Sequence, residues 1–197
     1  MVIGNIFLGM GVSIFKLSGM GNDAYNAMLM AMADKIGMSY APLFAVFSGG
    51  LFLIELVAGR KMIGAGTIVN TFFLGYIASF FYNIWISVFQ IPTAFAAKVI
   101  VMLIGVVVTG FGLSMYQLPD VGVSPYDSLS LILADRIKSV PYSWCRVFTD
   151  AICALAAFLM GGLVGLGTLI AAFGLGPVAQ FFNKTVTGKL LAKQQDR

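Results

Sequence analysis

Two stretches of the chain gather polar side chains between long apolar runs, at residues 9–26 and 110–127. Their carboxylates, amides, phenols and one ammonium group can hold ions or hydrogen-bonding solutes. We therefore take them as candidate substrate-binding segments. The candidate residues are Lys16, Asp23, Tyr25, Asn26, Gln117, Asp120, Tyr126 and Asp127.

Other kinds of chemistry find little support. The chain has no histidine, which removes histidine-based triads and histidine metal sites. Cys145 and Cys153 are eight positions apart on one predicted helix, about 12 Å at about 1.5 Å per residue. A disulfide needs Cα atoms within about 7 Å. We therefore expect no metal and no cofactor, and we do not expect an enzyme.

The composition is that of a membrane protein. Of the 197 residues, 59% are hydrophobic and 10% are charged, whereas soluble domains carry about 25% charged residues. Apolar runs of about 20 residues are long enough to cross a bilayer as helix. The opening run lacks the basic start of a cleavable signal, so it is expected to be a spanning helix, although a slightly short one. The six predicted spans are residues 2–17, 41–59, 62–89, 93–117, 141–161 and 163–183.

The sequence repeats itself at an offset of 101 residues. Gly9, Gly11, Ser13, Gly21 and Tyr25 fall on identical residues, and "ADKI" at 33–36 falls on "ADRI" at 134–137. The predicted fold is all-α, with a first three-helix repeat at 1–89, a second at 93–185 and a basic tail at 186–197. Because three crossings is an odd number, the second repeat must enter from the opposite side, as in many secondary transporters.

Each repeat contains a short helix after its first span. Asp23 and Ser124 occupy equivalent N-cap positions, and Pro125 suits the first helical position. About 13 residues of helix cannot cross a bilayer. The two short helices are therefore either interfacial connectors or re-entrant helices that bring irregular backbone toward the bilayer centre. The apolar Met28 and Met30 favour the re-entrant interpretation.

Basic residues indicate the topology. With both termini on one side, that side collects eight basic residues, while the other keeps mainly Lys16 and Lys35. This bias predicts cytoplasmic termini in the plasma membrane and explains the net charge of +4 without nucleic acid. The eight residues are Arg60, Lys61, Arg136, Lys138, Lys184, Lys189, Lys193 and Arg197.

Further polar residues lie inside predicted spans. Arg146 and Asp150 have the i, i+4 spacing of a helical ion pair, which is either structural or a proton- or ion-coupling group. Asn70 has an alanine, Ala171, at its equivalent position and is a second candidate for coupling. Glu55 lies near the end of its span and is expected at the membrane interface.

The stretches "GMGVSIFKLSGMGNDAYNAM" and "GRKMIGAGTIVNTFFLGYIASFF" resemble the YczE/YyaS/YitT-like group of bacterial multipass membrane proteins. The resemblance covers about residues 4–185, and "GVSPYD" in the second repeat is closer to that group's usual break than "GMGNDAYN". It implies an integral inner-membrane protein, with transport as the expected activity.

The expected function is transport of a small polar or zwitterionic solute by alternating access around a site at the repeat interface. A cation also fits the two breaks, whereas a simple anion fits poorly because carboxylates already occupy the helix N-termini. The expected partners are the lipid bilayer, a small-molecule substrate and a further copy of the chain. The alternatives are a nonenzymatic accessory or assembly protein without a transport cavity, and a channel.

Overall fold

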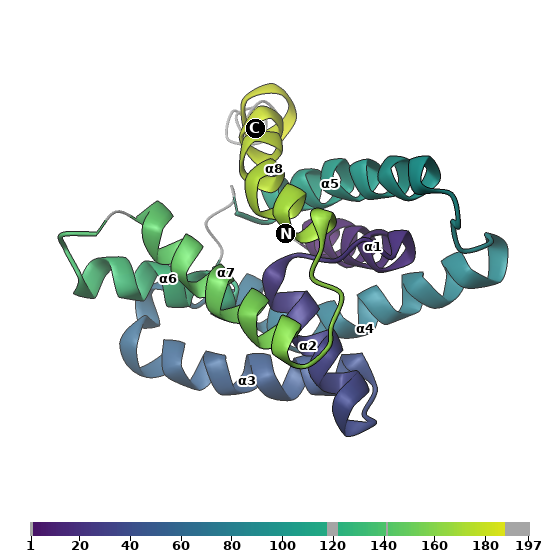
Figure 1. Ribbon diagram of the computed structural model, residues 1–197. Coiled ribbons are helices and arrows are strands. Elements are labelled where there is room, and N and C mark those ends of the chain that lie inside the picture. The colour runs from purple at the N-terminus through teal and green to yellow at the C-terminus, as the bar shows by residue number, and fades with distance from the viewer. Residues whose placement is uncertain (1, 118–121, 141, 188–197) are drawn as a thin grey trace.

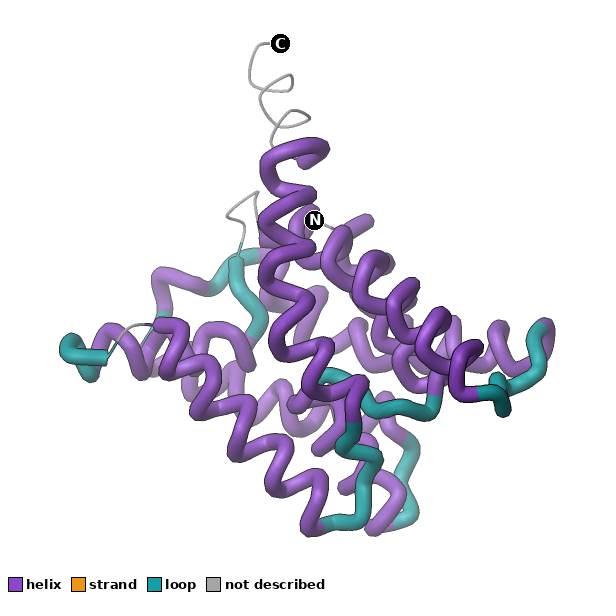
Figure 2. Tube along the Cα trace, turned by 45° about the horizontal axis from the view of Figure 1, so that its top comes forward, coloured by secondary structure: helices purple, strands orange, loops and turns teal. Residues whose placement is uncertain are grey.

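The computed structural model describes residues 2–117, 122–140 and 142–187. Within these ranges the chain forms eight α-helices and no strand. Figures 1 and 2 show how the helices are arranged. The helices are α1 Val2–Ser18, α2 Ala24–Ile36, α3 Tyr40–Ala58, α4 Ala65–Val88, α5 Phe95–Gln117, α6 Pro125–Arg136, α7 Tyr142–Leu159 and α8 Leu166–Phe182. A 3₁₀ turn at Arg60–Met62 and a π-helical turn at Asn183–Thr187 complete the described elements.

Four helices are long and apolar enough to cross a membrane: α3, α4, α5 and α8. Large apolar side chains such as Val57, Phe80 and Phe173 stay exposed on them, as expected of helices that contact lipid. The helices predicted at 2–17 and 141–161 are also present, as α1 and α7. Helix α1, with 17 residues, is a shorter apolar helix, and α7 is not among the four, so the crossing of both stays a prediction.

The two predicted short helices are confirmed, together with their caps. In α2 the Asp23 carboxylate accepts a hydrogen bond from the Asn26 amide at 3.1 Å, and in α6 the Ser124 hydroxyl accepts one from the Asp127 amide at 3.2 Å. Pro125 opens α6. Gly37 ends α2 with a φ of 69°, a left-handed conformation that glycine adopts without a steric penalty.

Glycines set the packing of α1 against α5, which lie side by side in Figure 1. A Cβ added to Gly4 would lie 2.8 Å from the Tyr116 amide nitrogen, and one added to Gly112 would lie 2.6 Å from the Leu8 nitrogen. A Cβ added to Gly11 would lie 2.9 Å from the Cα of Thr109. Residue numbers rise along one helix as they fall along the other, so α1 and α5 are antiparallel and their backbones are in direct contact.

Each polar break is held by the helix start of the opposite sequence half. Gly122 (φ 110°) packs on Gly64 and Thr67, and the Thr67 hydroxyl donates to the Val123 carbonyl at 2.8 Å. Gly21 (φ 114°) packs on Thr168. Both glycines have backbone conformations that other residues rarely adopt. Helix α2 also packs against α7, and α6 against α3, so the two halves are intertwined.

We expect Gly112→Ala to lower the thermal stability of the protein, because the added methyl group meets the backbone of α1. Overpacking of this kind typically costs about 1–3 kcal/mol. For a chain of this size, that cost corresponds to a fall in Tm of at least about 2 °C. Thermal unfolding of the detergent-purified protein measures the shift.

Gly50→Ala is the matched control. Gly50 lies within α3, and a Cβ there meets no atom within 4 Å. Because alanine favours helix over glycine by about 1 kcal/mol, its Tm should stay level or rise. Equal Tm values for the two variants would contradict the close α1–α5 contact.

Candidate functional site

A cavity of about 360 Å³ lies between the two sequence halves, and all eight α-helices contribute to its wall. Its volume falls within the range of small-molecule sites, about 300–1,000 Å³. The wall combines apolar side chains with a few convergent polar groups, the usual character of a binding pocket. The charged side chains in the described part of this wall are Asp23, Asp127, Arg146 and Asp150.

Tyr25 and Tyr126 stack face to face in the cavity wall. Their ring centroids are 4.4 Å apart and their planes differ by 13°. The two residues occupy equivalent positions of the sequence repeat, so a residue of the first half lies directly on its counterpart in the second. The Tyr25 hydroxyl shares a 2.8 Å hydrogen bond with Ser48, while the Tyr126 hydroxyl donates to Asp150.

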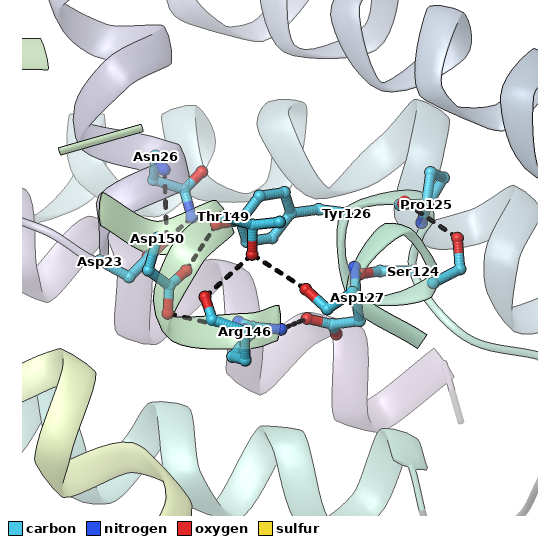
Figure 3. A network of polar contacts seen from close by, with 11 residues as sticks. Asp23, Asn26, Ser124, Pro125, Tyr126, Asp127, Arg146, Thr149 and Asp150 are labelled. Carbon is cyan, nitrogen blue, oxygen red and sulfur yellow. Dashed lines mark hydrogen bonds and ion pairs between the residues drawn. The ribbon is translucent and has the colours of Figure 1, made fainter. Parts of the chain in front are cut away.

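Arg146 connects two carboxylates, as Figure 3 shows. Its Nη1 forms an ion pair with Asp127 of α6, and its Nε donates to Asp150 of the same helix at 3.3 Å. The guanidinium carbon also lies 5.0 Å from the centroid of the Tyr126 ring. The predicted i, i+4 pair is therefore confirmed, but it is part of a larger network that ties α7 to the N-terminus of α6.

Asp23 has only neutral hydrogen-bond donors as partners in the described structure. The Asn26 side-chain amide donates to its carboxylate at 2.7 Å, in addition to the capping bond, and Tyr40 donates to the Asn26 carbonyl oxygen. Burial raises the pKa of the Asp23 carboxyl from its ordinary value, and the two bonds from Asn26 oppose the rise. The charges of Asp150 and Arg146 also act on Asp23.

Eight of the predicted site residues line this cavity: Asp23, Tyr25, Asn26, Asn70, Tyr126, Asp127, Arg146 and Asp150. The amide of Asn70 donates to Asn5 at 2.9 Å, and Asn70 is buried. Lys16 lies elsewhere. It is exposed, with its ammonium group 4.4 Å from the centroid of the Tyr82 ring. The side chain of Gln117 and the whole of Asp120 lie outside the described residues.

Among the cavity residues that the sequence did not single out, two carry unpaired hydroxyl groups. Thr109 and Tyr116 of α5 line the cavity, are 4% and 1% exposed, and have no hydrogen-bond partner for their hydroxyl groups in the described structure. Together with Leu113 they have the i, i+4, i+7 spacing of one helix face. That spacing was visible in the sequence, but nothing there distinguished the cavity-facing side of α5 from the side that faces other helices.

Glu55, which the sequence places near the end of its span, is covered by protein. It is fully buried where α3 packs against α6, close to Ser128 and within electrostatic range of Asp127. The neighbouring Gly59 packs on Ile132 of α6. Its depth in the membrane stays a prediction; what the sequence did not reveal is that a helix from the other sequence half covers this position.

The described residues contain no group of three or more histidine, cysteine, aspartate or glutamate side chains arranged to hold a metal ion. The three cavity aspartates are instead engaged by Arg146, Tyr126 and Asn26. What the arrangement can do is bind: it offers fixed charges and hydrogen-bonding groups around a small volume between two intertwined halves.

Exposed apolar helices around a polar cavity define the class of the protein, an integral membrane protein built of helices. The chain belongs to a family of unknown function, DUF6198, which matches residues 1–184.

Relatives support the resemblance seen in the sequence. An uncharacterized protein of Haemophilus influenzae is 28% identical over 175 residues, 89% of this chain and 78% of that protein. The uncharacterized protein YyaS of Bacillus subtilis is 26% identical over 98% of this chain and 95% of its own length. The uncharacterized membrane protein YczE of the same organism is 24% identical over 90% and 81%. No solved structure matches the chain.

We expect Arg146→Gln to destabilise the protein, because it leaves Asp127 and Asp150 as neighbouring carboxylates without their shared cation. Adding Asp127→Asn should restore part of the loss, since it removes one of the two uncompensated charges. The Tm of the purified variants measures both effects, with an expected fall of at least about 2 °C for the single change, the shift that about 1 kcal/mol produces. A double variant less stable than Arg146→Gln alone would show that the pairing is not what holds these helices.

Proposed function

We propose that the protein is a membrane transporter that moves a small polar or zwitterionic solute by alternating access, without enzymatic activity. The observation that carries the proposal is the cavity between the two sequence halves, where the equivalent residues Tyr25 and Tyr126 stack and Asp127 meets Arg146. A site at the interface of two halves can open to either side when one half rocks against the other. Ionisable residues inside a membrane helix bundle mark functional sites by default, which favours a transporter over an accessory protein without a transport cavity.

The architecture proposed for this transporter has six membrane crossings in two inverted three-helix repeats, residues 1–89 and 93–185. The antiparallel contact of α1 with α5 supports this arrangement, because equivalent helices of inverted repeats run in opposite directions. The contacts between the halves also recur at the offset of 101. The contact of Gly11 with Thr109 corresponds to the contact of Gly112 with Leu8. The contact of Gly21 with Thr168 corresponds to the contact of Gly122 with Thr67.

The short helices α2 and α6 are proposed to be re-entrant. Eight of the residues of α2 are buried, on more than one face, and α2 packs against both α3 and α7. An interfacial connector would keep one face against lipid headgroups and water. Burial by protein on several sides is what permits a helix end and irregular backbone to lie at membrane depth.

The proposed topology, with both termini in the cytoplasm of a plasma-membrane protein, is testable by cysteine labelling. In a background with Cys145→Ser and Cys153→Ser, a cysteine replacing Gln90 should react with a membrane-impermeant maleimide in intact cells. A cysteine replacing Lys61 should react only after the membrane is opened. Gln90 and Lys61 are both exposed; Lys61 precedes α4 and Gln90 follows it, so they lie on different sides if α4 crosses the membrane. The reverse labelling pattern would show that the topology is opposite to the proposed one. Labelling of both cysteines in intact cells would contradict the crossing of the membrane by α4.

Uptake into liposomes tests the transport activity and the site together. The purified protein is reconstituted and presented with labelled solutes of different charge classes, beside the double variant Asp23→Asn, Asp127→Asn. Hydrogen bonds to charged groups contribute about 1.5–3 kcal/mol, and about 1.4 kcal/mol is a factor of ten. We therefore expect at least a tenfold lower initial uptake rate for this variant.

The sequence repeat offers a matched control. Asp34→Asn with Asp135→Asn removes the same two charges from equivalent, exposed positions outside the cavity. This variant should keep the uptake of the unaltered protein. Equal uptake in the two double variants would contradict the proposed site. Uptake of every solute at the level of protein-free liposomes would contradict the proposed transport function. Size-exclusion chromatography establishes that each variant is folded before uptake is compared.

A further inference from the structure

The cavity has an excess of negative charge. Three carboxylates, Asp23, Asp127 and Asp150, line it against one guanidinium, Arg146, which is the only basic side chain among the described residues of the wall. Three minus one leaves two negative charges without a cation. Even without the charge of Asp23 the excess is one. Within a low-dielectric cavity such an excess attracts a cation and repels an anion.

We propose that the substrate is a small organic cation with a protonated primary amine and a neutral hydrogen-bonding group at its other end, of which an amino alcohol is the simplest example. This inference rests on the proposed transport function and specifies its substrate class. It does not follow from the acidic residues alone. A second and independent observation comes from another part of the cavity wall, on α5.

That second observation is a pair of buried hydroxyl groups. Tyr116 and Thr109 line the same cavity, and neither hydroxyl has a hydrogen-bond partner in the described structure. Buried polar groups are normally paired, and an unpaired one costs about 1–3 kcal/mol. A substrate hydroxyl or amide can pair with either of them. A substrate carboxylate would find no cation here, because Arg146 is already held by Asp127 and Asp150.

The tyrosine rings decide what kind of cation is favoured. One face of Tyr126 is covered by Tyr25, and the Arg146 guanidinium also lies against the Tyr126 ring. Tyr25 is further contacted at its ring by Phe44. These rings therefore do not form the open aromatic cage that recognises quaternary ammonium groups. Recognition through carboxylate oxygens requires N–H donors instead, which a primary amine has and a trimethylammonium group lacks.

The rate of uptake should depend on the charge of the solute when the size of the solute is held constant. Liposomes containing the protein are given labelled ethanolamine as the cation, glycine as the zwitterion, glycolate as the anion and choline as the quaternary cation, each with a longer-chain homologue. We expect initial uptake of the primary amines to exceed that of the other three classes at least tenfold. Faster uptake of the zwitterion, the anion or choline would overturn the inference while leaving the transporter intact. Uptake of no class above protein-free liposomes would instead overturn the proposed function and the inference with it.

A variant on α5 tests the second half of the proposal. Tyr116→Phe removes the unpaired hydroxyl and should reduce the preference for ethanolamine over ethylamine, its analogue without the hydroxyl, by about tenfold. Tyr76→Phe removes a hydroxyl from an exposed tyrosine of α4 and should leave the preference unchanged. An unchanged preference in Tyr116→Phe and in Thr109→Val would show that these hydroxyl groups do not contact the substrate and would overturn this part of the inference.

Discussion

The shared ion pair of Arg146 with Asp127 and Asp150 is the interaction on which the rest of the site depends. Placing several charges inside an apolar helical bundle is expensive, and each must find a partner to be tolerated. Arg146 satisfies two carboxylates at once, from α6 and α7, and lies against the ring of Tyr126. A single guanidinium thus fixes the N-terminus of one short helix, the middle of a neighbouring helix and one of the two stacked rings.

The surrounding scaffold makes this network possible by bringing backbones unusually close. Glycines at the crossing of α1 and α5 hold the two halves together through main-chain contacts, which leaves the larger side chains free to line the cavity or to face lipid. The breaks at Gly21 and Gly122 are each anchored on the first turn of a helix from the opposite half. The cavity is therefore enclosed by both halves and cannot be formed by either alone.

The sequence predicted the helices well because their signals are local. Long apolar runs, the caps at Asp23 and Ser124, and the glycine breaks depend on neighbouring residues, and the offset of 101 pointed to equivalent positions. Contacts between halves were not accessible in the same way. The repeat placed Tyr25 and Tyr126 in one site, but spacing along α7 could reveal only Asp150 as a partner of Arg146, while Asp127 comes from another helix. Lys16 was selected for its position in the break, yet it projects toward Tyr82 of α4 instead of the cavity.

The contacts between the halves are isologous, as in a twofold symmetric dimer: Gly11 meets Thr109 while its counterpart Gly112 meets Leu8. In a dimer of two identical chains, every group near the axis is duplicated, and two copies of a charged cluster would lie close together. Here the cluster of Arg146 with its two carboxylates belongs to one half, whereas the other half contributes the single carboxylate of Asp23. Asp127, Arg146 and Asp150 correspond to Asn26, Ala45 and Gly49 in the other. Joining the halves in a single chain is what allows two structurally equivalent surfaces to carry different charges, so that one asymmetric cluster can occupy the centre of a nearly symmetric scaffold.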